Sequence, residues 1–331
     1  MTRILVSGSI ATDHLMTFPG RFAEQLIADR LHTVSLSFLV DGLVVRDGGV
    51  AANIAYGMAQ LGMPPTLVGA VGPDFADYRS RLERHGVDCG SVLTSRSSYT
   101  ARFVCTTDQD SCQIASFYPG AMAEAADIDL AAVIGSEPVD LAVIGPDDPV
   151  AMRRHAAACR RLGVPFAADP SQQLARMSGP DIADFVTGAR YLLTNEYEYD
   201  LLCGKLGGAG ATVLDAVDVV VTTLGEDGVR IRAGGGITRI PAVTGASVVD
   251  PTGGGDAFRA GFLYGVTHGL LLDVAAALGC QMGAYAIGAP GTQEYRVVPD
   301  RLVANLSDTY GHRVSAAVAE VLTSCAAAAA G

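Results

Sequence analysis

The sequence predicts an α/β protein with a mostly parallel central sheet, helices on both faces of that sheet, and a small β-sheet lid. The first observation is that short, fully apolar strands alternate with helical patterns from about residue 120. Such strands are typical of a parallel sheet that is covered on both faces. The second observation is that residues 14–48 read as strands and not as a helix crossing between strands. The length of 331 residues accommodates one large domain with this excursion, or two domains.

The N-terminal half is predicted to supply the first core strands and the lid. Residues 3–9 form an apolar strand that ends in small side chains, and the dinucleotide fingerprint GxGxxG is absent. Asp41-Gly42 is a hairpin signal between strands at 34–38 and 43–45. The remaining elements are a helix from the Gly48-Gly49 pair through Leu61, a strand at 65–71, a helix at 76–85, and strands at 100–107 and 113–118.

The second half is predicted to complete the core. Strands are expected at 141–144, 166–169, 191–194 and 219–222, with helices at 149–162, 253–268, 272–287 and 299–309. A loop is expected at 207–210, and a fraying helix or tail at 322–331. We therefore divide the chain into an α/β core of residues 1–13, 49–98 and 119–331 and a β lid of residues 14–48 and 99–118.

Composition argues against several classes of function. The net charge is −12 and the pI is about 4.8, so nucleic acids and membrane surfaces are poor partners. Lys205 is the only lysine, which argues against a Walker A loop and against Schiff-base chemistry. The seven cysteines form no CxxC pair, and no apolar run reaches membrane-spanning length. Because no signal peptide precedes the first strand, we expect a cytoplasmic protein with reduced thiols.

The strongest local signal lies in residues 249–258. Three consecutive glycines, Gly253, Gly254 and Gly255, lead into a helical pattern. Backbone N–H groups and the helix N-terminus therefore converge on one point, which suits an anion such as phosphate. Asp256 would repel phosphate there, unless it takes a proton from an attacking hydroxyl. The alternative is a glycine-rich turn that opens a helix with an acidic residue in its first turn.

The pattern Asp-x-Thr-Gly-x-Gly-Asp in this stretch is similar to the second signature of the ribokinase-like (PfkB) carbohydrate and nucleoside kinases. The resemblance implies a ribokinase-like fold, with Asp256 as the catalytic base and the amides of Gly253 to Gly255 as the anion hole. The middle position, commonly Ala in the family, is Gly254. Motifs occur in family order from Asp13 to Gly291, so the resemblance covers nearly the whole chain.

On the acceptor side, the resemblance implies that Asp13 grips ribose hydroxyls in a loop beyond the first strand. It also implies that Gly48 and Gly49 let the lid hinge, and that Asn53 on the next helix meets the sugar. Without the resemblance, Asp13 reads equally as an Asx turn and the glycine pair as a simple helix start. The expected substrate-binding set also includes Ser9 and Ser37.

On the donor side, Asn195 and Glu198 directly follow a strand and form a capping box. In the resemblance, the same Asn-x-x-Glu organises Mg²⁺ and the phosphates of ATP, with Glu198 acting through metal-bound water. The turn after residue 222 lies along ATP in the family, although a hairpin turn is its simpler interpretation. The expected nucleotide-binding residues are Asn195, Thr223, Gly225, Gly228 and Gly255.

A monovalent cation is also implied. Members of the family often hold one by backbone oxygens at the positions of Asp250, Thr252 and the loop that contains Gly291. We therefore expect K⁺ to raise activity.

Several segments look like bacterial, actinobacterial-type adenosine kinases, namely residues 7–22, 32–44, 115–122 and 168–176. The resemblance implies an ATP-dependent kinase that phosphorylates the 5′-hydroxyl of adenosine. Phe103 and Phe117 would stack on the purine, or else simply pack the lid. Gln172 and Gln173 offer amides to a base edge, or else form a polar loop.

Two alternatives remain open. One is a sugar kinase of the ribose or fructose class on the same scaffold. The other is a non-catalytic nucleotide or sugar sensor, against which the presence of Asp256 argues. We also expect a homodimer through the lid, because its apolar strands have two faces and only one of them can cover a ligand.

Overall fold

The computed structural model describes residues 2–26, 28–33 and 35–330. Its centre is an eight-stranded sheet in the order β14-β13-β12-β11-β10-β9-β1-β4. The strands from β12 to β4 pair in parallel, whereas β13 pairs antiparallel with both β12 and the edge strand β14. The prediction of a mostly parallel sheet is therefore confirmed. The strands are β1 (Ile4–Ser7), β4 (Thr66–Val68), β9 (Leu141–Ile144), β10 (Phe166–Ala168), β11 (Tyr191–Asn195), β12 (Val219–Thr223), β13 (Val229–Ala233) and β14 (Gly236–Ile240).

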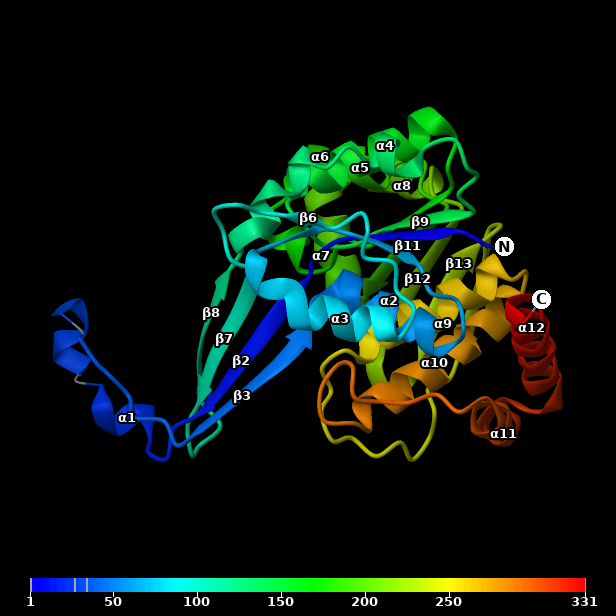
Figure 1. Cartoon of the computed structure of the whole chain (residues 1–331). Helices are drawn as coiled ribbons and strands as arrows, with labels where there is room; N and C mark the ends of the chain where they lie inside the picture. The colour runs from blue at the N-terminus through cyan, green and yellow to red at the C-terminus, as the bar shows by residue number, and fades with distance from the viewer. Residues whose placement is uncertain (1, 27, 34, 331) are drawn as a thin grey trace.

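Helices cover both faces of this sheet (Figure 1). Side chains alternate between the faces along a strand, so Ile4 and Val6 of β1 enter one hydrophobic cluster and Leu5 enters the other. The first face carries α2 (Val50–Gln60), α3 (Ala76–Arg84), α9 (Gly254–Thr267), α10 (Leu272–Ile287), α11 (Pro299–Tyr310) and α12 (His312–Ala330). The second face carries α4 (Leu130–Ile134), α5 (Pro149–Leu162), α6 (Gly179–Val186), α7 (Glu196–Leu206) and α8 (Gly210–Asp215).

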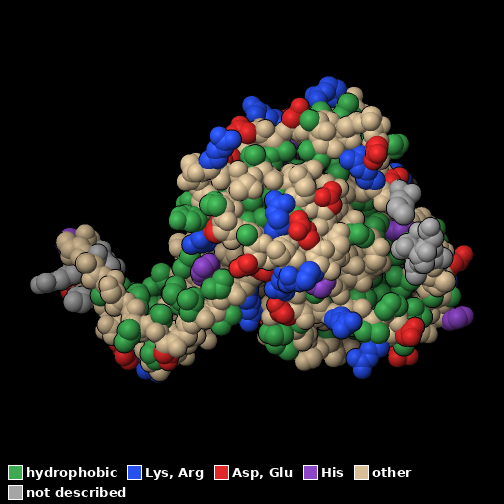
Figure 2. Space-filling model, in the orientation of Figure 1, with side chains coloured by type: hydrophobic (Ala, Val, Ile, Leu, Met, Phe, Trp, Pro, Cys, Tyr) green, Lys and Arg blue, Asp and Glu red, His purple; other side chains and the backbone are tan. Residues whose placement is uncertain are grey.

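A separate four-stranded sheet projects from the core and is called the lid below (Figure 1). Its order is β3 (Gly42–Gly48), β2 (Ala11–Thr17), β7 (Ala101–Thr107) and β8 (Gln113–Tyr118). Its far end carries the short helix α1 (Phe22–Gln25), where the rings of Phe18, Phe22 and Phe38 pack with centroids 5.0–5.4 Å apart. Figure 2 shows hydrophobic side chains along this projecting arm.

The predicted hairpin between residues 34–38 and 43–45 is wrong. Residues 35–40 have no strand, Val34 lies outside the described residues, and β3 pairs with β2 instead. Asp13 therefore lies within a strand and not in a loop. The sequence did not indicate β2 as a strand because Asp13 and His14 interrupt its apolar alternation. Phe38, which was assigned to a strand, instead packs in the aromatic cluster at the far end of the lid.

Three smaller differences concern the core. The predicted strand at 65–71 divides into β4 and a two-residue strand β5 (Ala70–Val71), which pairs with β6 (Leu93–Thr94) in a third sheet. The predicted loop at 207–210 is a 3-10 turn, Gly207–Ala209, that leads into α8. The segment at 322–331, predicted as a fraying helix or a tail, is helical as far as Ala330 and forms the last part of the longer helix α12. In the described ranges, no helix has both the length and the apolar character needed to cross a bilayer.

Candidate active site

Polar residues gather where the parallel strands of the central sheet end. Asp169 follows β10, Asn195 ends β11 and Thr223 ends β12, and Asn195 lies directly opposite Thr223 in the ladder. The carboxyl ends of neighbouring parallel strands lie at one edge of a sheet, where open α/β proteins bind their ligands. The sequence prediction that these segments share a site is therefore physically consistent with the sheet order.

Asp256 lies in the first turn of α9, directly after the glycine turn. Gly253 has a φ of 81°, and a Cβ there would lie 2.9 Å from Cβ and Cγ2 of Thr292. Only glycine fits that combination of left-handed backbone and close approach. Asn53 of α2 donates a hydrogen bond from Nδ2 to Oδ2 of Asp256 at 2.8 Å. Two residues predicted from separate motifs are thus in contact.

The buried, positively charged side chain of Arg259 lies beside Asp256, and the sequence analysis did not identify it. Arg259 pairs with Asp169, with Nε 2.5 Å from Oδ2 and Nη2 2.9 Å from Oδ1. Its Nη2 also lies 3.9 Å from Oε2 of Glu198. Arg259 follows Asp256 by three positions on α9, so both face the same side of the helix. This spacing, and the place of Asp169 just after a buried strand, are the signals that could have indicated the pair.

Burial and this cluster shift the pKa values of both carboxylates. For Asp256, burial raises the pKa, while the charge of Arg259 and the hydrogen bond from Asn53 lower it, and the net shift is upward. For Asp169, burial raises the pKa to about 7 against the opposing charge of Arg259. The net upward shift leaves Asp256 better able to accept a proton than an ordinary surface carboxylate.

Glu198 is placed by the predicted capping box at the start of α7. Its backbone N–H donates to Oδ1 of Asn195 at 2.8 Å, and Asn195 N–H donates to Oε2 of Glu198 at 2.8 Å. Ser171 Oγ lies 3.4 Å from Oε1 of Glu198. The carboxylate is thus held rigidly near the start of α9, where Asp256 lies, and its oxygens are hard donors of the kind that Mg²⁺ prefers.

Four lid residues form one row across the lid sheet. Asp13 on β2 lies directly opposite Arg46 on β3 and Phe103 on β7, and Phe103 lies opposite Phe117 on β8. Side chains directly opposite each other in a ladder project from the same face. That face is directed to the core, because Arg46 Nη1 forms an ion pair with Oδ2 of Asp250 at 2.8 Å. The structure therefore aligns Asp13 with both predicted aromatic residues.

Asp13 and Ser9 closely approach the glycine pair Gly48-Gly49. A Cβ on Gly48 would lie 3.0 Å from Oδ2 of Asp13, and one on Gly49, with φ 94°, would lie 2.6 Å from Ser9 O. Burial raises the pKa of Asp13 to about 6, although the charge of Arg46 lowers it. Ser9 accepts a hydrogen bond at Oγ from Val50 N at 3.1 Å, so its side chain helps to begin α2.

The expected cation-binding residues contact an arginine. Asp250 accepts at Oδ1 from Thr252 N at 3.0 Å and at Oδ2 from Arg46 Nη1 at 2.8 Å. Burial raises the pKa of Asp250, but these hydrogen bonds and the charge of Arg46 outweigh it and lower the pKa overall. A Cβ on Gly291 would lie 2.9 Å from Cδ of Arg46, so the arginine also packs on that loop. The sequence analysis did not identify Arg46.

The other predicted residues make fewer contacts with the residues described above. Ser37 is exposed in the irregular segment at the far end of the lid, away from the strand ends at which Asp256 lies. Gln172 is exposed and accepts from Ser171 Oγ at 2.6 Å, whereas Gln173 is buried, and its Oε1 has no hydrogen-bond partner among the described residues. Gly225 and Gly228 adopt φ values of 60° and 89° in the turn after β12.

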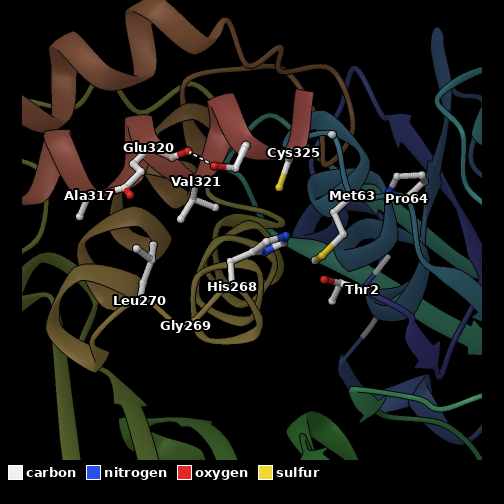
Figure 3. Close-up of a pocket in the computed structure, with 12 residues that line it drawn as sticks. Thr2, Met63, Pro64, His268, Gly269, Leu270, Ala317, Glu320, Val321 and Cys325 are labelled. Carbon is white, nitrogen blue, oxygen red and sulfur yellow. Dashed lines mark hydrogen bonds between the residues drawn. The ribbon is translucent and has the colours of Figure 1, made fainter. Parts of the chain in front are cut away.

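A separate cavity of about 730 Å³ lies between α12, the α9–α10 turn and the turn after α2. Figure 3 shows Val321 and Cys325 of α12 on one side of it, with His268 and Met63 across from them. Its described lining residues include none of the predicted site residues. The cavity is thus distinct from the strand ends described above.

Comparisons with known proteins agree on one family. Residues 9–299 match the pfkB family carbohydrate kinases. The chain is 32% identical over 251 residues to a nucleoside kinase of Methanothermobacter thermautotrophicus, covering 74% of this chain and 80% of the relative. The structure of the Burkholderia thailandensis nucleoside kinase in complex with inosine has a TM-score of 0.83 and 35% identity, covering 93% of this chain and 99% of that one.

The fold is also that of more distant proteins. The ribokinase of Thermotoga maritima has a TM-score of 0.76 at 20% identity, covering 93% of this chain and all of that chain (100%). The fold is therefore ribokinase-like. The finer resemblance to actinobacterial adenosine kinases stays a prediction. The family match spans every predicted site residue from Ser9 to Gly291, and the chain belongs to the pfkB family of carbohydrate kinases, ATP-dependent phosphotransferases that act on a hydroxyl group.

Proposed function

We propose that the protein is a nucleoside kinase that phosphorylates the 5′-hydroxyl of a purine nucleoside, with adenosine as the preferred acceptor. The observation that carries the proposal is the row formed by Asp13, Phe103 and Phe117 on the core-facing side of the lid. A carboxylate suits ribose hydroxyls, and two aromatic rings suit a flat base. Stacking of a base on an aromatic side chain is worth about 1–3 kcal/mol. A free sugar offers nothing flat to these rings.

The names of the similar proteins support the same acceptor class. The Methanothermobacter relative and the Burkholderia structure are both called nucleoside kinases, and the latter was solved with inosine. Inosine is a purine nucleoside, so the comparison favours a nucleoside over a free sugar. It leaves the choice between adenosine and inosine to experiment, and the adenosine preference is our own proposal.

In the proposed reaction, Asp256 accepts the proton of the 5′-hydroxyl as its oxygen attacks the γ-phosphorus. The bond from that phosphorus to the β–γ bridging oxygen breaks, and ADP leaves with the electron pair. The N–H groups of Gly253 to Gly255 donate to the developing negative charge on the phosphoryl oxygens. Asp13 and Asn53 hold the ribose, and the lid excludes water so that the phosphoryl group reaches the nucleoside.

The donor side is proposed to use Asn195, Thr223, Gly225 and Gly228 to hold ATP. Glu198 is the proposed partner of Mg²⁺, through water, because its capped position is rigid and its oxygens are hard donors. When bound, Mg²⁺ neutralises charge on the phosphates. Arg259 forms ion pairs with both Asp169 and Glu198 and so helps to hold the two carboxylates in place.

We propose that K⁺ binds through backbone oxygens beside Asp250, next to the ion pair that the Asp250 carboxylate forms with Arg46. The resemblance places a monovalent cation beside Asp250, Thr252 and Gly291, and Arg46 contacts the same carboxylate at 2.8 Å. The guanidinium group supplies positive charge there without any metal. K⁺ should therefore raise activity in the natural protein, and more strongly when Arg46 is removed.

The test of the proposed acceptor is a comparison of kcat/KM for adenosine, inosine, ribose and fructose under the same ATP and Mg²⁺ concentrations. Adenosine is expected to have the highest value and the two sugars the lowest. A higher value for ribose or fructose would replace the nucleoside by a sugar as acceptor. Absence of phosphorylation with every acceptor, despite ATP binding, would favour a sensor.

A homodimer through the outer face of the lid is proposed as well. Leu43, Val45 and Ile114 are 60%, 53% and 47% exposed, and their register positions put them on the face opposite Asp13. Such an apolar surface favours a partner. A light-scattering mass of one chain at micromolar concentration would contradict the dimer. A cytoplasmic location also stays a prediction from the sequence.

A further inference from the structure

Gln293 is a buried glutamine within the loop between α10 and α11, and the residue is 3% exposed. Its Nε2 lies 2.9 Å from Oδ1 of Asn53 and 2.5 Å from Oη of Tyr78. Tyr78 in turn donates from Oη to the carbonyl oxygen of Gly48 at 3.0 Å. A chain of buried hydrogen bonds thus runs from the lid hinge to Asn53.

The donors and acceptors along this chain have one consistent direction. Tyr78 uses its only hydrogen on Gly48 O, so its oxygen is free to accept from Gln293. The second N–H of Gln293 points to Asn53, whose Oδ1 accepts it. The amide nitrogen of Asn53 therefore faces Asp256, and Nδ2 donates to Oδ2 of Asp256 at 2.8 Å. With the amide of Asn53 reversed, two oxygens would face each other.

Gln293 is itself held in place from several directions. Arg81 donates from Nη2 to the carbonyl oxygen of Gln293 at 2.9 Å, and its Nη1 lies 3.2 Å from Oδ2 of Asp47. The neighbouring Thr292 donates from Oγ1 to Asp47 O at 3.1 Å. The loop is therefore tied to α3 and to the lid strand β3. These contacts fix the backbone of Gln293, and the bond from its Nε2 to Tyr78 directs the side chain, so that it can impose an orientation on its neighbour Asn53.

We propose that Gln293 is a positioning residue for the phosphoryl transfer, which fixes the amide of Asn53 so that Asn53 donates to Asp256. The proposal rests on the proposed role of Asp256 as base. A hydrogen bond to the ionised form stabilises that form and keeps Asp256 able to accept a proton at lower pH.

Other charges also face Asp256 and remain when Gln293 is changed. They are the charges of Arg259 on α9, Glu198 on α7, Asp169 after β10, Asp13 on the lid, and Tyr295 in the loop after α10 if its hydroxyl is ionised. Because none of these groups is altered by a change at position 293, a shift in the pH dependence of turnover reports on the Gln293–Asn53 contact. Asp13 is expected to act on nucleoside binding, so the pH profile is measured as kcat at saturating nucleoside.

The test compares the kcat–pH profiles of Gln293→Met and Gln293→Asn with the natural protein, using the acceptor with the highest kcat/KM. Methionine removes both donors at similar size, and asparagine keeps an amide but withdraws it from Asn53. The matched control is Gln281→Met, because Gln281 is a buried glutamine on α10 that is also 3% exposed. Melting temperatures show whether each variant remains folded.

Both Gln293 variants are expected to move the acid limb of kcat upward by about one pH unit, which is about tenfold in rate below that limb. Rates at high pH should approach those of the natural protein, and Gln281→Met should leave the limb unchanged. An unmoved acid limb in both folded Gln293 variants would overturn the proposal, even if they melt at lower temperature. In that case, an inactive Asp256→Asn variant would still support the proposed base; an active one would remove the base itself.

Discussion

Asn53 and Asp256 are joined by a hydrogen bond of 2.8 Å, although they lie 203 positions apart on α2 and α9. The contact brings the predicted sugar-binding residue and the predicted base together. Asp256→Asn should keep the fold and nucleoside binding but lower kcat by about a hundredfold or more, because the general base is lost. Steady-state kinetics and calorimetric binding check this. Asp200→Asn, at an exposed position of α7, is the control and should retain full activity.

Asp13 makes the stability of the ligand-free protein depend on pH. Its pKa in the folded protein is about 6 against 3.8 in the reference state. The folded state therefore binds more protons between these values, so the contribution of Asp13 is fully present below pH 3.8 and is lost as pH rises through 6. Asp13→Asn should be more stable than the natural protein at pH 7–8 and lose that advantage toward pH 4.

Denaturant unfolding at several pH values measures this difference, and nucleoside affinity should fall in the same variant. Asp41→Asn is the matched control, because Asp41 is an exposed carboxylate of the lid. A stability difference between Asp13→Asn and the natural protein that is constant from pH 4 to 8 would show that Asp13 has an ordinary pKa.

Arg46 contacts the carboxylate of Asp250, the residue beside which K⁺ is proposed to bind. Arg46→Met removes the charge and keeps much of the length. The ratio of kcat in potassium to kcat in tetramethylammonium should exceed one in the natural protein and increase in the variant. Ionic strength is kept constant. Equal rates in the two salts for both proteins would argue against any cation site beside Asp250.

The aromatic row of the lid predicts a selective effect on the acceptor. Phe103→Ala and Phe117→Ala should raise KM for the nucleoside, by about fivefold or more for the loss of 1 kcal/mol of stacking, and raise KM for ATP less. Tyr118→Ala is the control. Tyr118 follows Phe117 on β8, is 45% exposed, and projects from the opposite face. An equal rise of the nucleoside KM in all three variants would contradict stacking.

Gly254 occupies a position that is commonly alanine in the family, and Ile287 fills the corresponding space. A Cβ on Gly254 would lie 2.7 Å from Cγ2 of Ile287. Gly254→Ala alone should therefore destabilise the protein by about 1–3 kcal/mol through overpacking. Combined with Ile287→Ala, the loss should be smaller than the sum of the single losses by about 0.5 kcal/mol or more. Thermal unfolding of the four proteins measures this cycle, and strict additivity would contradict the contact.

The elements that the sequence predicted best are those with a strong local pattern. The strand 141–144 and the helix 149–162 agree with β9 and α5. A fully apolar run and a helical pattern that starts with proline can be recognised without knowledge of tertiary contacts. The lid was predicted less well. β2 has little apolar alternation of its own, and pairing with β3 and β7 makes it a strand.

The sequence by itself determined the glycine turn, the place of Asp256 at the start of a helix, and the parallel sheet, because each depends on residues adjacent in the chain. The tertiary structure alone decided that Arg46 meets Asp250, that Arg259 pairs with Asp169, and that Gln293 donates to Asn53. These contacts join side chains that are 90 to 240 positions apart. A sequence can indicate that one such side chain faces a site, as the spacing of Asp256 and Arg259 does, but it does not name the partner, since only the packing of the lid and helices onto the sheet brings the two within hydrogen-bond distance.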